Sequence, residues 1–98
     1  MKGYFMYGIA VNFNDYLNAK IGNTIEEVIA NTDEVQGIFA GRDSDFVIVG
    51  RVLKNVDEDT AEPHEVPVLD RWEEIVVLAN VKKKFDISGE GHYYFITR

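Results

Sequence analysis

The 98-residue sequence contains no cysteine, only two prolines and no long apolar run. Without cysteine the chain cannot form disulfides, thiolate zinc sites or a cysteine nucleophile, and this fits a cytoplasmic protein. The longest unbroken apolar run, Ile75–Ala79, is too short to span a bilayer, so we expect no membrane association. Tyrosines and glycines interrupt the apolar start of the chain, which therefore predicts a strand and not a signal peptide.

Basic residues are outnumbered by acidic ones. The chain carries 17 aspartates and glutamates against 10 lysines and arginines, for a net charge of −7. The imbalance lies in residues 26–74, where fourteen acids face four bases and give a net charge of −10. Such a segment repels the phosphates of nucleic acids and attracts basic protein surfaces, although charge of this size also serves ordinary solubility. We therefore predict a basic protein surface as partner and no nucleic-acid binding.

The remaining composition predicts one folded α+β domain over residues 1–98. Hydrophobic residues make up 46% of the chain and aromatic residues 12%, which is enough for a modest core. Runs of aromatic and β-branched residues predict strands at residues 4–13, 34–40, 46–54 and 92–97. Capping patterns predict helices at about residues 25–31 and from residue 70, with a short helical piece at residues 15–20.

The second helix has to be chosen against a competing pattern. Asp70 and further acids at its start and Lys82–Lys84 at its end suit the helix dipole. Residues 75–81 also fit a strand, because three β-branched residues lower helix propensity. The helix would carry two apolar stripes, one of Val68, Leu69, Trp72, Ile75, Val76 and Ala79, and one of Val77, Leu78, Val81 and Phe85. The caps favour the helix and give the order β-α-β-β-α-β, which folds economically as a ferredoxin-like sandwich, a four-stranded antiparallel sheet with two helices.

Both faces of the predicted sheet are apolar. Residues 46–53 alternate Phe46, Ile48 and Val52 with Val47, Val49 and Leu53. Because the helices would cover only one face, the other needs a second chain, a partner, a ligand or the chain's own loops. A homodimer is the first choice, since twofold self-association is the commonest solution for small domains. The predicted dimer or ligand face consists of Tyr4, Met6, Val47, Val49, Arg51, Tyr93 and Phe95.

No constellation of catalytic or metal-binding residues is evident. Residues 43–45 space two aspartates like metal ligands but lack the further oxygens that a hard cation needs. Gly41 and Gly50 are too far apart to hold one phosphate, and Gly50, inside a strand, indicates a bulge or a close backbone approach. Acid–base chemistry at His92, near Glu90, would require a cleft around that residue. We predict a protein that is not an enzyme and has no metal or cofactor.

These features favour a small acidic protein-interaction module. Acidic single-domain proteins of this size include inhibitors, immunity proteins and mimics of nucleic acid, an analogy that depends on size and charge alone. The alternative is a regulatory domain that binds a small molecule and acts as a dimer. The acidic residues expected to meet the partner are Asp57, Glu58, Asp59, Glu62 and Glu65.

Overall fold

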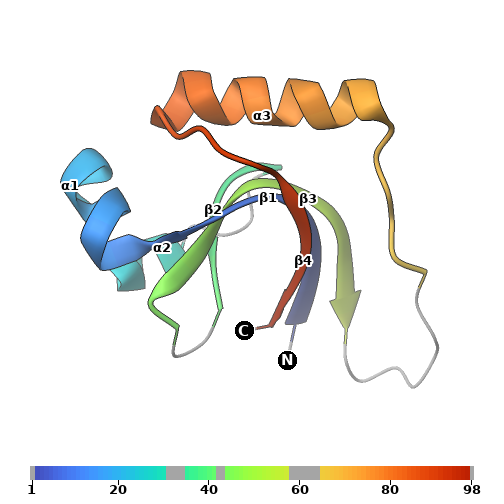
Figure 1. Ribbon diagram of the computed structural model, residues 1–98. Helices are drawn as coiled ribbons and strands as arrows, with labels where there is room; N and C mark the ends of the chain where they lie inside the picture. The colour runs from blue at the N-terminus through green and yellow to red at the C-terminus, as the bar shows by residue number, and fades with distance from the viewer. Residues whose placement is uncertain (1, 31–34, 42–43, 58–64, 98) are drawn as a thin grey trace.

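The computed structural model describes residues 2–30, 35–41, 44–57 and 65–97 as an α+β fold built on one sheet (Figure 1). The strands are β1 (Lys2–Asn12), β2 (Gln36–Ala40), β3 (Phe46–Asp57) and β4 (His92–Thr97). The helical segments are a π-helical turn (Phe13–Leu17), α1 (Asn18–Ile21), α2 (Ile25–Ala30) and α3 (Arg71–Phe85). The predicted α+β class is confirmed, and the predicted strands and helices are present with their ends shifted by a few residues.

The predicted caps set the starts of α2 and α3. The Thr24 hydroxyl accepts from the Glu27 amide at 3.3 Å, and the Glu27 carboxylate accepts from the Thr24 amide at 3.1 Å, which completes a capping box. The Asp70 carboxylate accepts from the Glu73 amide at 2.8 Å and caps α3. Residues 75–81 lie inside α3, so the competing strand prediction is wrong.

The four strands form an antiparallel sheet in the order β2-β3-β1-β4. The register of the central pair shifts once, between Phe5 and Met6, where Leu53 bulges out of β3. On its other side, β1 pairs with β4 only as far as Gly8. Beyond Gly8, no described strand pairs with that side of β1, which therefore has an open edge.

The main core lies between the helices and one face of the sheet. Val28 of α2 and Val77 and Val81 of α3 pack there with residues of β1 and β3. Val47 and Val49 of β3 belong to this core and are 0% exposed. Burial of an aliphatic side chain of this size stabilises the fold by about 1.5–3 kcal/mol. Thus α2, which precedes β2, and α3, which follows β3, cover the same face of the sheet.

A sharp bend in the sheet closes the opposite face. Gly37, Gly50 and Gly8 are cross-strand neighbours on β2, β3 and β1, and we call them the glycine row. A Cβ atom added to Gly50 would lie 2.6 Å from the Gly8 Cα, so the two strands approach too closely for a larger residue. The close backbone approach predicted for Gly50 is confirmed.

The bend folds this face onto itself. Ala10 of β1 is level with Phe39 of β2, so Tyr4 would be about 20 Å from Phe39 along a flat sheet. The ring centroids of Tyr4 and Phe39 are instead 6.4 Å apart. With Met6 and Ile48 they form a second cluster, whose members are between 0% and 6% exposed. The part of this face that carries the second cluster is therefore buried within the single chain, whereas Phe46, the first residue of β3 and on the same face as Ile48, is 57% exposed.

The predicted dimer or ligand face does not exist as one surface. Tyr4 and Met6 belong to the second cluster, whereas Val47, Val49, Arg51, Tyr93 and Phe95 lie at positions of the helix-covered face. Joining the two sets was wrong, because odd and even positions of a strand point to opposite faces. Because the second cluster is buried within one chain, it gives no reason to expect a homodimer.

Candidate functional site

Exposed apolar side chains gather on α3 and the segment before it. Trp72 is 71% exposed, and Ile75 and Val76 continue the row at helical spacing on α3. Val66 and Val68, in the segment before the helix, are exposed as well. Of the two stripes predicted on this helix, the one that contains Val77 is buried and the one that contains Trp72 faces solvent. We call the exposed apolar side chains on the helix, Trp72, Ile75 and Val76, the outer face of α3.

Acidic side chains lie next to this outer face in the sequence. Glu65, Asp70 and Glu73 are exposed. Of the residues predicted to meet a basic partner, Asp57 and Glu65 are exposed, and Glu58, Asp59 and Glu62 lie outside the described residues. The outer face of α3 is therefore an apolar strip with exposed carboxylates at its N-terminal end.

A polar cleft of about 430 Å³ lies between α3 and the start of β4. Its ionisable lining residues are Tyr7, Arg71, Glu74, Glu90, His92 and Tyr93. The Tyr93 hydroxyl fixes one wall, because it donates to the Glu74 carboxylate at 2.7 Å and accepts from the Leu69 amide at 2.9 Å. The structure thus contains the cleft around His92 that acid–base chemistry there would require.

Burial and nearby carboxylates shift the pKa values of the two tyrosines in this cleft. Burial, and after it the negative field of Glu74, raises the pKa of Tyr7 above its ordinary value. Burial and the hydrogen bond to Glu74 raise the pKa of Tyr93 in the same way. The His92 ring is exposed, and no described residue hydrogen-bonds to it.

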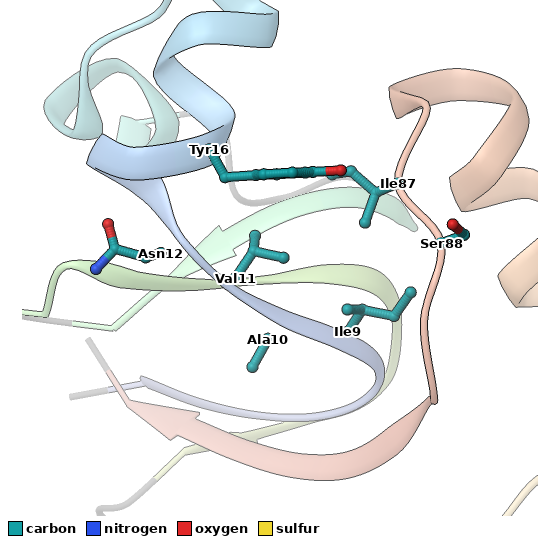
Figure 2. Close-up of a pocket in the computed structure, with 7 residues that line it drawn as sticks. All are labelled: Ile9, Ala10, Val11, Asn12, Tyr16, Ile87 and Ser88. Atoms are coloured by element: carbon teal, nitrogen blue, oxygen red, sulfur yellow. The ribbon is translucent and has the colours of Figure 1, made fainter.

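A second hollow, of about 360 Å³, lies at the open edge of β1 (Figure 2). Its lining residues are Ile9, Ala10, Val11, Asn12, Tyr16, Ile87 and Ser88. Ile9 and Val11 point into the hollow from β1, and the Tyr16 ring extends over them (Figure 2). Side chains with apolar surface thus dominate the walls, with the Ser88 hydroxyl at one end. We call this hollow the edge groove.

The aspartate pair singled out in the sequence does not form a described metal site. Asp45 is exposed at the start of β3, and Asp43 lies outside the described residues. Within the described ranges, no three histidine or carboxylate side chains come together as a metal ion would require. None of the helices in these ranges has both the length and the apolar character needed to cross a bilayer.

Sequence reasoning missed Tyr7, Arg71 and Glu74 as members of the polar cleft. They come from β1 and from the first turn of α3, so only the tertiary fold brings them together. The sequence contains one signal for this cleft, which is Gly91 beside His92. A glycine has no side chain, so another part of the chain can pack closely against it. A Cβ atom at Gly91 would lie 2.5 Å from the Tyr7 Cζ.

Comparison with known proteins assigns no relative to this chain. No family model matches it, and searches of curated proteins and of solved structures find no similar protein.

Proposed function

We propose that the protein is a small, acidic, non-enzymatic interaction module, and that the outer face of α3 docks into an apolar groove with a basic rim on a partner protein. The observation that carries this proposal is the 71% exposure of Trp72 within a row of apolar side chains. Water penalises exposed apolar surface by about 25 cal/mol per Å², so a partner that covers this row gains binding free energy.

The spacing of the outer face suits a helix that lies in a groove. Trp72, Ile75 and Val76 occupy positions i, i+3 and i+4, which form one ridge along a helix. Tryptophan is among the residue types most enriched in interface hot spots. Truncation of Trp72 should therefore cost about 2 kcal/mol of binding free energy, or about thirtyfold in affinity.

Charge supports a basic partner. The net charge is −7, and Asp70 is exposed at the N-terminal end of α3, with Glu65 exposed in the segment before it. Complementary charge at the rim of an interface speeds association and makes it sensitive to salt. Inhibitors, immunity proteins and mimics of nucleic acid are the classes that share this size and charge, and we place the protein among them by analogy.

We also propose that the fold is a ferredoxin-like sandwich. The strand order β2-β3-β1-β4 and the helices packed on one sheet face support this assignment. The first connection departs from the simplest form, since it consists of a π-helical turn, α1 and α2 in place of one continuous helix.

Affinity capture from a lysate of the source cells tests the proposed interaction. Trp72→Ser is compared with Val35→Ser, a matched control because Val35 is 68% exposed but lies just before β2. We expect one basic protein to be captured at low salt by the original chain and by Val35→Ser, and not by Trp72→Ser. Equal capture by both variants would show that the outer face of α3 is not the binding site. Capture that is insensitive to salt would show that the partner's groove has no basic rim.

The second candidate is a regulatory domain that binds a small molecule and acts as a dimer. The edge groove favours it, because an apolar hollow of about 360 Å³ with a few polar groups is the usual form of a small-molecule site. A metabolite that raises Tm, with sedimentation velocity that shows a dimer, would support this candidate. The absence of both in a broad metabolite screen would count against it.

A further inference from the structure

The polar cleft contains a tyrosine hydroxyl without a partner. The Tyr7 side chain is only 5% exposed, yet among the described residues none forms a hydrogen bond with its hydroxyl. No polar side-chain atom in the described part of the chain is both fully enclosed and unpaired, so this oxygen reaches the surface of the cleft. Because it is open to the cleft, this hydroxyl is available to hydrogen-bond with a ligand that enters there.

Neighbouring groups hold this hydroxyl in place. The Tyr7 and Tyr93 rings pack with their centroids 4.8 Å apart. Gly91 lies against the end of the Tyr7 ring, where a Cβ atom would be 2.5 Å from the Tyr7 Cζ. Tyr93 is itself tied to Glu74 by the 2.7 Å hydrogen bond. The floor of the cleft is therefore a fixed aromatic pair and does not collapse to satisfy the hydroxyl.

The charges around the hydroxyl favour a cation. Two carboxylates, Glu74 and Glu90, line the cleft, and the Glu74 side chain is only 19% exposed. Arg71 opposes them weakly, because its guanidinium is 4.0 Å from Glu74 and its side chain is 86% exposed. Both carboxylates would repel an anionic ligand. A cation would be attracted by the two carboxylates and by the electron-rich faces of the tyrosine rings.

We propose that this cleft binds a small organic cation, an alkyl compound that bears a protonated amine. The ammonium donates hydrogen bonds to the Glu90 carboxylate and to the unpaired Tyr7 hydroxyl oxygen, close to the charge of Glu74, and the alkyl chain packs on Leu78. The inference does not depend on the proposed function, since none of the residues that line the cleft belongs to the outer face of α3.

An NMR titration of the full chain tests the site with three probes of equal length: n-butylammonium, 1-butanol and butyrate. We expect saturable shifts of the Gly91 and His92 amides with n-butylammonium, and no saturable shifts with the neutral or the anionic probe. Equal or stronger binding of butyrate would overturn the proposal, because it would make Arg71 the anchor. The absence of saturable shifts with n-butylammonium would overturn it as well.

Three variants then separate a specific site from diffuse attraction. Tyr7→Phe should weaken n-butylammonium binding about tenfold, the loss of one hydrogen bond from a charged donor. Glu90→Gln should weaken it about tenfold or more, the loss of a charged acceptor. Glu73→Gln is the matched control, because Glu73 is exposed on α3 outside the cleft and its change removes the same charge. Equal weakening by Glu73→Gln and Glu90→Gln would refute the site, and the dispersed spectrum of each variant reports that it folds.

Discussion

Replacement of Gly50 by alanine should remove a large part of the stability of this protein. The added Cβ would lie 2.6 Å from the Gly8 Cα, whereas ordinary contacts are 3.4–4 Å, so β1 and β3 would have to separate by about 1 Å. Overpacking of this kind costs about 1–3 kcal/mol, and the strained ladder hydrogen bonds add about 1 kcal/mol, so we expect a loss of about 3 kcal/mol. For a chain of this length, that loss lowers Tm by about 12–24 °C.

Urea unfolding followed by far-ultraviolet circular dichroism measures this loss, with Gly41→Ala as the matched control. At Gly41 the nearest atom to an added Cβ is the Thr97 carbonyl oxygen at 3.6 Å, an ordinary contact. Gly41→Ala should therefore stay within about 1 kcal/mol of the original chain, since the change mainly reduces the entropy of the unfolded state. If Gly50→Ala is as stable as Gly41→Ala, the close approach of β1 and β3 is not what closes the second sheet face.

Three further predictions concern single polar groups. Asp70→Ala removes the cap of α3 and should lower the free energy of unfolding by about 1 kcal/mol in urea, whereas Asp70→Ser should restore most of it. The hydrogen bond from Lys82 at 2.8 Å lowers the pKa of Asp86, so this carboxylate stabilises the fold while it is ionised. The stability difference between the original chain and Asp86→Asn should thus be present at neutral pH and disappear as the pH falls below the ordinary aspartate pKa; a difference that does not change with pH would contradict the ion pair. In a spectrophotometric titration, Tyr93→Phe should eliminate one tyrosine whose pKa lies above the ordinary 10.0. If the tyrosine that disappears has an ordinary pKa, burial and Glu74 do not raise the pKa of Tyr93.

Local patterns were sufficient to predict the secondary structure. The Thr24 and Asp70 caps depend on residues three positions apart, so the sequence contains the whole interaction. Strand alternation also assigned residues such as Val47 and Ile48 to opposite faces correctly. These features depend on neighbours in the chain and need no knowledge of the tertiary fold.

Which surfaces remain exposed could not be predicted in the same way. α3 has apolar residues on two sides, and the choice to bury Val77 and expose Trp72 depends on how the helix docks on the sheet. The second sheet face has the same difficulty, because its burial requires Tyr4 to meet Phe39 across an intervening strand. The polar cleft likewise brings Tyr7 of β1 next to the first turn of α3. The local sequence of β1 does not indicate this neighbour, and neither does the local sequence of α3.

The glycine row also affects the kinetics of folding and unfolding. We expect Tyr4 and Phe39 to meet only after β1, β2 and β3 have paired, because their rings come together across the intervening strand β3. The loops that connect these strands must close first, so the ring contact belongs to the late part of the folding reaction. Weakening that contact, as in Phe39→Leu, should therefore accelerate unfolding and leave the refolding rate nearly unchanged. The ring contact that the bend creates would then act mainly on the unfolding rate, which sets the lifetime of the native state.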